Sequence, residues 1–201
     1  IGGSIPQQIG LLNSLNELSL YANNLTGSIP SSIGNLVNLP NLYLYDNQLS
    51  GSIPQEIGML RSLIELILYR NYLTGSIPAS IGNLSNLTNL YLHYNKLFGS
   101  IPPMFNNLTH LTILSLSVNM LTGQIPEGLF FNGLLERFTV DDKNLVGPIP
   151  KSLRNCSSFY RVRLERNQIS GNISEDFGIY RSLDYIDLSH NNFYGELSKN
   201  W

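Results

Sequence analysis

Residues of the types that perform catalysis are few in this chain, and their spacing matches no catalytic or metal-binding motif. The three histidines, His93, His110 and His190, are far apart, and the single cysteine, Cys156, cannot form an intrachain disulfide or a thiolate zinc cluster. No GxSxG, P-loop, GxGxxG or HExxH motif is present. We therefore expect no enzyme, no cofactor and no metal site, and we expect Cys156 to be a small buried apolar residue.

Residues of the types that bind peptides and proteins are more regularly spaced. Tyr21, Tyr45 and Tyr69 are 24 residues apart, and so are Arg137 and Arg161. Tyrosine and arginine are enriched at the energetic centres of binding surfaces, and tyrosine combines apolar area with a hydrogen-bonding hydroxyl. The common spacing indicates that a repeating structure positions these side chains.

The composition excludes several classes of function. The chain has 201 residues, a formal net charge of −2 and 13% charged residues, so it lacks the basic face that nucleic-acid binding requires. No run of about 18 apolar residues could span a membrane, and the first ten residues lack the features of a signal peptide. We expect no nucleic-acid partner and no membrane contact by this part of the chain.

Glycine marks a strict internal repeat. Nine glycines follow one another at steps of 24 residues, from Gly3 to Gly195, without insertion or deletion. An isoleucine or leucine stands two residues after each of them, a proline follows it in seven units, and an asparagine stands four residues before the glycine except at Lys143. Self-similarity at a fixed period is the signature of stacked repeats.

Each unit carries about seven apolar positions that it cannot bury alone. In the unit LNELSLYANNLTGSIPSSIGNLVN, Leu18 and Leu20 alternate with polar residues, which predicts a short strand. Stacked units bury the apolar positions as one column, in which each leucine or isoleucine contributes about 1.5–3 kcal/mol. We expect the asparagine amides to bond buried backbone groups, the glycines to occupy left-handed or tightly packed positions, and the prolines to lie outside the central ladder.

The pattern LxxLxLxxNxLxGxIPxxIGxLxN resembles the plant-specific class of leucine-rich repeats. It appears here as LNELSLYANNLTGSIPSSIGNLVN and LTNLYLHYNKLFGSIPPMFNNLTH, and the resemblance covers the whole chain. The resemblance implies a repeat solenoid with a right-handed twisted superhelix, a parallel β-sheet on the concave face, loops, short 3-10 turns and a second short sheet. We expect residues 1–201 to form one leucine-rich-repeat domain fragment of about nine partial or complete repeats, with both paired-cysteine caps missing.

The same resemblance implies recognition of a ligand. The segment from Lys151 to Trp201 is most similar to receptor kinases that sense secreted peptides. This similarity predicts a plant receptor-kinase ectodomain on the extracellular side of the plasma membrane, as part of a longer single-pass signalling receptor. Its expected partners are a secreted peptide or protein and a co-receptor kinase with a shorter ectodomain. The alternatives are a secreted inhibitor of the polygalacturonase-inhibiting type and a kinase-less receptor-like protein.

Side chains that alternate with the inward-pointing leucines should face the concave side. Repeats in phase align these positions, which begin at Glu17, Ser19, Tyr21 and Ala22, as four stripes with a step of about 4.8 Å. Seven of the eleven tyrosines fall in the four stripes. The predicted ligand-binding residues are Tyr21, Tyr43, Tyr45, Ile67, Tyr69, Arg70, Tyr91, His93, Tyr94, Arg137, Asp141, Arg161, Arg163, Glu165 and Arg166.

The four stripes predict a surface for an extended peptide of roughly ten residues, because eight strands span about 35–40 Å. We expect the tyrosine-rich half to contact apolar or small hydroxyl side chains, and the arginine-rich half to bind a carboxylate such as a peptide C-terminus. An alternative is that these residues reflect strand propensity and that Asp141, Asp142 and Glu165 neutralise the arginines. Adjacent carboxylates such as Asp141 and Asp142 can perform acid–base chemistry, but the arginines nearby favour both ionised forms.

Two further features of the sequence carry expectations. Six N-x-S/T sequons, against roughly 3.6 expected by chance, predict glycosylation; they begin at Asn24, Asn83, Asn86, Asn107, Asn155 and Asn172.

The unit 124–147 replaces the usual IGNL with LFFNG and has Lys143 in place of asparagine. We expect an altered convex loop in this unit and an altered ladder at Lys143, or else ordinary drift within a repeat array.

Overall fold

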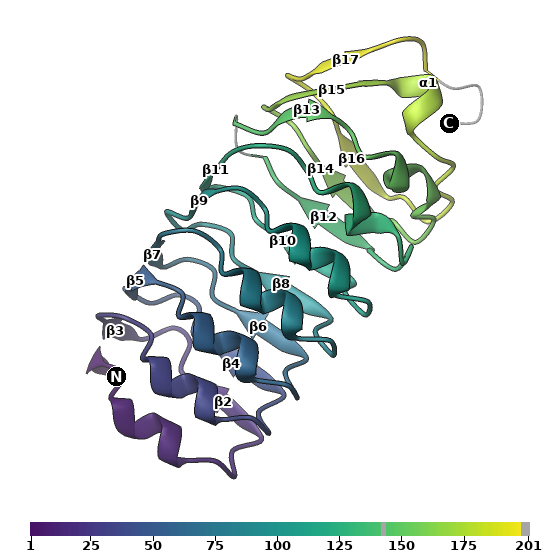
Figure 1. Ribbon diagram of the computed structural model, residues 1–201. Coiled ribbons are helices and arrows are strands. Elements are labelled where there is room, and N and C mark those ends of the chain that lie inside the picture. Colours follow the sequence, from purple (N-terminus) through teal and green to yellow (C-terminus); the bar gives the residue numbers. More distant parts are fainter. Residues whose placement is uncertain (142–143, 198–201) are drawn as a thin grey trace.

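The chain forms a stack of coils, each of which runs through an inner strand, a short outer strand and a 3-10 turn (Figure 1). The computed structural model describes residues 1–141 and 144–197. The inner strands form one eight-stranded parallel sheet in sequence order. Its strands are β2 (Glu17–Ser19), β4 (Asn41–Tyr43), β6 (Glu65–Ile67), β8 (Asn89–Tyr91), β10 (Ile113–Ser115), β12 (Arg137–Thr139), β14 (Arg161–Arg163) and β16 (Tyr185–Asp187).

The outer strands form the expected second sheet as four short pieces. The pieces pair β1 (Gly2–Ser4) with β3 (Asn24–Thr26), β5 (Ser50–Ser52) with β7 (Tyr72–Thr74), β9 (Phe98–Gly99) with β11 (Met120–Leu121), and β15 (Gln168–Asn172) with both β13 (Val146–Pro148) and β17 (Asn192–Tyr194). Further backbone hydrogen bonds join successive pieces. The Ser50 N–H donates to the Gly27 carbonyl at 2.8 Å, and the Val146 N–H donates to the Gly123 carbonyl at 2.9 Å.

Prolines begin the 3-10 turns on the opposite side of each coil from the inner strand. Their φ angles, between −76° and −59°, suit the position before the turn. The turns are η1 (Gln7–Leu11), η2 (Ser31–Asn35), η3 (Gln55–Met59), η4 (Ala79–Asn83), η5 (Pro103–Asn107), η6 (Glu127–Phe130) and η7 (Lys151–Asn155). In the coil where Ser174 replaces proline, a single turn of α-helix forms instead, α1 (Ile173–Asp176). Within the described residues, no helix is long and apolar enough to cross a bilayer.

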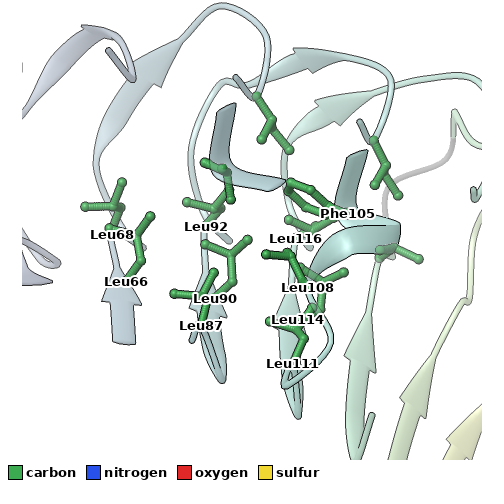
Figure 2. Close-up of a cluster of buried hydrophobic side chains, with 14 of the residues drawn as sticks. Leu66, Leu68, Leu87, Leu90, Leu92, Phe105, Leu108, Leu111, Leu114 and Leu116 are labelled. Carbon is green, nitrogen blue, oxygen red and sulfur yellow. The ribbon is translucent and has the colours of Figure 1, made fainter. Parts of the chain in front are cut away.

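Leucines from successive coils pack into the continuous core that the period predicts. Figure 2 shows Leu66, Leu90 and Leu114 lying side by side on neighbouring inner strands. All three are fully buried, and Phe105 of η5 belongs to the same hydrophobic core. The coils therefore bury one another's apolar faces, as a repeat that cannot bury its own face requires.

Asparagine side chains link neighbouring coils through hydrogen bonds to the backbone, as expected. The Nδ2 group of Asn71 donates to the carbonyls of Leu68 in its own coil at 3.1 Å and of Leu44 in the preceding coil at 3.0 Å. Its Oδ1 accepts the Leu49 N–H at 3.0 Å. One side chain thereby satisfies three backbone groups that would otherwise be buried without partners.

Glycine serves two different purposes in each coil. The glycines of the 24-residue column have φ between 72° and 87°, as predicted, except Gly171, which has no positive φ. The glycines inside the turns, such as Gly58, are needed for close packing, because a Cβ there would lie 2.4 Å from the Ser80 carbonyl oxygen. The positive φ of the 24-residue glycine column was predicted, whereas the close packing of the glycines inside the turns was not.

The unit 124–147 keeps its place in the stack but changes its turn, as predicted. Strand β12 pairs in register with both β10 and β14. Turn η6 has four residues, Phe131 is exposed after it, and the Phe130 ring packs edge-to-face on Phe138 at 5.2 Å. Asp142 and Lys143, to which the predicted altered ladder refers, lie outside the described residues.

Candidate ligand-binding face

The register of the inner sheet aligns the four predicted stripes. Each inner strand pairs with residues 24 positions further along, so Glu17 lies beside Asn41 and Arg137 lies beside Arg161. The fifteen predicted ligand-binding residues all belong to the described part of the chain. They lie on the inner strands or within three residues after them, on the face opposite the core.

A ladder of four stacked rings occupies the first half of the third stripe. The rings of Tyr21 and Tyr45 lie 4.4 Å apart, those of Tyr45 and Tyr69 lie 4.6 Å apart, and those of Tyr69 and His93 lie 4.5 Å apart, with planes within 16° of parallel. The faces of Tyr45 and Tyr69 are covered on both sides, so a ligand meets ring edges and hydroxyls there. Burial raises the pKa of the Tyr45 and Tyr69 phenols, and the neighbouring tyrosines and Asp46 add to the shift.

His93 ends this ladder and joins it to the polar half of the sheet. Its Nδ1 atom lies 3.1 Å from the Ser115 hydroxyl, which in turn lies 2.9 Å from the Thr139 hydroxyl. Burial and the positive charge of Arg70 lower the pKa of His93 to about 4. The imidazole is therefore neutral at physiological pH and acts as a hydrogen-bonding aromatic ring.

A second polar chain crosses the first stripe. The Tyr43 hydroxyl donates to Oε2 of Glu65, and the Asn89 amide donates to Oε1 of the same carboxylate. Burial and the bond to Glu65 raise the pKa of Tyr43 above its ordinary value. Glu65 was not among the predicted site residues, although its place beside the tyrosines in the stripes could have indicated it. Ile67 lies half-buried on the same strand as Glu65.

Two of the four predicted arginines in the arginine-rich half are neutralised by carboxylates. Arg163 bonds Glu165 through Nε at 2.9 Å, and its Nη2 lies 3.3 Å from Asp141. Arg166 lies 3.5 Å from the same Asp141 oxygen. Burial lowers the pKa of Arg163, but the bond to Glu165 and the charge of Asp141 outweigh it, so that the pKa is raised. For these two arginines, the alternative of mutual neutralisation is the better description.

The other two arginines, Arg137 and Arg161, lie opposite each other on β12 and β14. In the described part of the chain neither forms an ion pair with a carboxylate. Their guanidinium groups lie over aromatic rings instead, 5.6 Å from the centre of Tyr160 and 4.9 Å from the centre of Tyr185. Like charges on directly opposite residues repel each other, so an anion between them would relieve the repulsion. The roles of Tyr160 and Tyr185 were not predicted.

A hollow of about 330 Å³ lies over the junction of the two halves. Tyr91, His93 and Ile113 line one part of it, and Arg137, Arg161 and Arg163 line another. Burial raises the pKa of the Tyr91 phenol although the charge of Arg137 opposes the shift. The hollow places aromatic edges and unneutralised guanidinium groups within reach of one ligand.

The fourth stripe has a backbone geometry that the sequence did not reveal. Its described members share φ angles between 52° and 58°, in the left-handed region that non-glycine residues rarely adopt. They are Ala22, Asp46, Arg70, Tyr94, Val118, Arg166 and His190. All of them directly precede a ladder asparagine, which is the signal that could have indicated the turn. Arg70 in this stripe forms an exposed ion pair with Asp46 at 3.6 Å, and its guanidinium group lies 5.6 Å from the centre of the Tyr94 ring.

The predicted glycosylation sites lie away from the inner sheet. Five of the six asparagines are exposed, on the outer strand β3 or in the 3-10 turns and the loops after them. They are Asn24, Asn83, Asn86, Asn107 and Asn155. Asn172 is half-buried, and its Oδ1 accepts the Ser174 N–H at 3.1 Å to cap α1. Among the other predictions, Cys156 is buried as expected, and burial raises the pKa of its thiol.

Comparison with known proteins gives consistent matches. A family model described as Leucine Rich Repeat matches residues 14–36, 38–60, 62–84, 86–108 and 110–132. No curated protein gives a significant match. The leucine-rich-repeat ectodomain of the receptor kinase GASSHO1/SCHENGEN3 from Arabidopsis thaliana, solved with CASPARIAN STRIP INTEGRITY FACTOR 2, is 37% identical, with a TM-score of 0.91 over 96% of this chain and 23% of that one.

Two further solved structures show the range of the similarity. The Arabidopsis receptor kinase HAESA, solved with the peptide hormone IDA and the co-receptor SERK1, is 35% identical, with a TM-score of 0.90 over 96% of this chain and 32% of that one. A plant ice-binding protein is 32% identical, with a TM-score of 0.84 over 99% of this chain and 64% of that one. The chain thus spans about a quarter to a third of these two receptor ectodomains.

Proposed function

Because this chain belongs to the leucine-rich-repeat family, we propose that its inner sheet is a ligand-binding face, and that it binds a secreted peptide as part of a plant receptor-kinase ectodomain. The similar structures include peptide-hormone receptors, which supports recognition of a peptide. On this proposal residues 1–201 act as one domain on the extracellular side of the plasma membrane, within a longer single-pass receptor. A co-receptor kinase of the kind bound to HAESA would be a second partner.

The observation that carries the proposal is the pairing of Arg137 and Arg161 beside the aromatic ladder. Repulsion between the two guanidinium groups disfavours this arrangement in the absence of an anion. A carboxylate placed between them would receive charge-assisted, forked hydrogen bonds. A peptide whose carboxylate lies at Arg137 and Arg161 would extend its remaining residues over the hollow toward His93 and Tyr69.

Capture of peptides from apoplast extract tests the proposal when variants of the inner face are compared with a variant outside it. The 201-residue chain and the variants Arg137→Gln and Arg161→Gln are immobilised, and bound peptides are identified by mass spectrometry. Loss of a charged hydrogen bond is worth about tenfold in affinity, so each variant should retain about a tenth of the bound peptide. Arg61→Gln is the matched control, since Arg61 is exposed in the loop after η3, away from the inner sheet.

The outcomes separate the candidate functions. Peptides retained by the original chain and by Arg61→Gln, but lost from the two inner-face variants, support a peptide receptor. Capture of a pectin-degrading enzyme without peptides would favour the secreted-inhibitor alternative. Equal peptide capture by all four proteins would contradict a role for the inner sheet.

A further inference from the structure

Among the described residues, three neighbouring side chains of the third stripe hold polar atoms that have no hydrogen-bond partner. Ser117, Asp141 and Glu165 follow His93 in this stripe, one coil after another, and are only 6%, 6% and 5% exposed. The Ser117 hydroxyl, Oδ1 of Asp141 and Oε2 of Glu165 are buried without any hydrogen bond. Buried polar groups in folded proteins nearly always have a partner, so three in a row require an explanation.

The neighbouring hydroxyls of the second stripe, by contrast, have partners, although the Ser32 hydroxyl of η2 is also buried without one among the described residues. Ser115, two residues before Ser117, bonds both His93 and Thr139. Oδ2 of Asp141 receives both Arg163 and Arg166, whereas Oδ1 of the same carboxylate receives nothing. Ser117 and Asp141 both line the hollow that Arg137 and Arg161 line. Two of the three side chains with an unused acceptor therefore lie at the candidate ligand site.

We propose that Ser117 and Asp141 form a subsite that accepts an uncharged hydrogen-bond donor of the peptide, a hydroxyl or an amide group. This inference rests on the proposed function, because it assigns chemistry to one part of the same face. A ligand hydroxyl that reaches Oδ1 of Asp141 gives this carboxylate the partner that it lacks, and the Ser117 hydroxyl completes the pair.

The charges around the hollow decide between an uncharged donor and a cation. Four arginines and one carboxylate, Asp141, are the charged groups among the described residues that line it. Their net positive charge disfavours a lysine or arginine side chain of the ligand. Serine, threonine, asparagine or glutamine at one ligand position fits both the unused acceptors and the surrounding charge.

Selection from a random library of decapeptides with free C-termini tests the subsite. The original 201-residue chain should enrich serine, threonine, asparagine or glutamine at one fixed distance from the C-terminus. The best selected peptide is then synthesised with that residue and with alanine in its place. Alanine should weaken binding to the original chain about tenfold, as expected for a lost hydrogen bond to a charged acceptor.

The variants Ser117→Ala and Asp141→Asn locate the effect. In both, the tenfold preference for the donor-bearing peptide over its alanine partner should fall to about threefold or less. Ser31→Ala, an exposed serine of η2, should keep the full preference. Ser117→Ala removes no existing hydrogen bond, so its melting temperature should stay unchanged, which keeps the test valid if Asp141→Asn does not fold.

Each other outcome overturns a defined claim. Selected peptides without a donor preference, or with lysine or arginine at that position, overturn the subsite and leave the peptide-binding function standing. A preference that survives both substitutions does the same. A crystal structure of the selected complex in which only water reaches Oδ1 of Asp141 also overturns it. Failure to select any peptide overturns the proposed function itself and the subsite with it.

Discussion

The imidazole of His93 lies flat against the phenol ring of Tyr69, with ring centres 4.5 Å apart and planes inclined by 10°. Burial on the inner sheet, together with the positive charge of Arg70, keeps the histidine uncharged in the folded chain at neutral pH. The same contact places a titratable group at the centre of the candidate site, where the aromatic ladder meets the polar half of the sheet.

The first prediction concerns stability at acid pH. The pKa of His93 is about 4 in the folded chain, against 6.5 for an unperturbed histidine. As the pH falls from 6.5 toward 4, the unfolded chain takes up this proton before the folded chain does, so the free energy of unfolding should decrease. His93→Gln should flatten this decrease in urea denaturation at pH 7, 5.5 and 4.5. The exposed-residue control His110→Gln should retain it; equal slopes for all three proteins would contradict the prediction.

The second prediction concerns the strained fourth stripe. Val118 has a φ of 55°, and a β-branched side chain is poorly suited to the left-handed region. Asparagine tolerates this region, so Val118→Asn should raise the free energy of unfolding by about 1 kcal/mol. Val37→Asn is the control, because Val37 has nearly the same exposure, 42% against 41%, without a positive φ. Stabilisation of both variants alike would show that polarity, not strain, is responsible.

The third prediction concerns the asparagine ladder. Asn71→Ala removes the partners of three buried backbone groups, belonging to Leu44, Leu49 and Leu68. Each unsatisfied group costs about 1–3 kcal/mol, so thermal or urea unfolding should show a loss of about 3 kcal/mol or more. Asn38→Ala, at an exposed position after η2, should change stability by less than about 0.5 kcal/mol. A loss below 1 kcal/mol for Asn71→Ala would mean that water replaces the amide.

The fourth prediction compares the two kinds of glycine. Gly58→Ala places a methyl group 2.4 Å from the backbone oxygen of Ser80, so neighbouring coils must move apart. Overpacking of this kind costs about 1–3 kcal/mol. Gly51→Ala meets nothing closer than 3.5 Å and is limited to the strain of its φ of 73°, about 1–2 kcal/mol. Gly58→Ala should also broaden the unfolding transition, because it separates η3 from η4, whereas Gly51→Ala should leave the transition cooperative.

The repeat made the fold predictable from sequence to an unusual depth. Each position recurs with the same environment, so Leu66, Leu90 and Leu114 had to share one column, and Asn71 had to lie where backbone groups lacked partners. The stripes of the inner face followed from the alternation of side chains along a strand. The constant 24-residue period and the alternation of side chains along each strand therefore specified which residues lie on the same face of the sheet.

The chemistry of the face was less predictable because it depends on side-chain torsions and on local backbone geometry. The period places Tyr45 beside Tyr69, but only their torsion angles stack the rings and cover their faces. The spacing of residues in the sequence likewise does not show that Asp141 forms ion pairs with Arg163 and Arg166, whereas Arg137 forms none within the described residues. The left-handed φ of Val118 was missed because its neighbours, not its own side chain, impose it.

The constant register of the inner sheet also limits which residues of an extended ligand can contact equivalent positions in successive coils. Adjacent strands are about 4.8 Å apart, whereas an extended chain advances by about 3.4 Å per residue, so about three ligand residues correspond to two coils. Because the side chains of an extended ligand alternate in direction, two residues that point the same way are about 6.8 Å apart and do not match the strand spacing. Duplicating or deleting one coil would therefore shift the phase between ligand and receptor beyond that point.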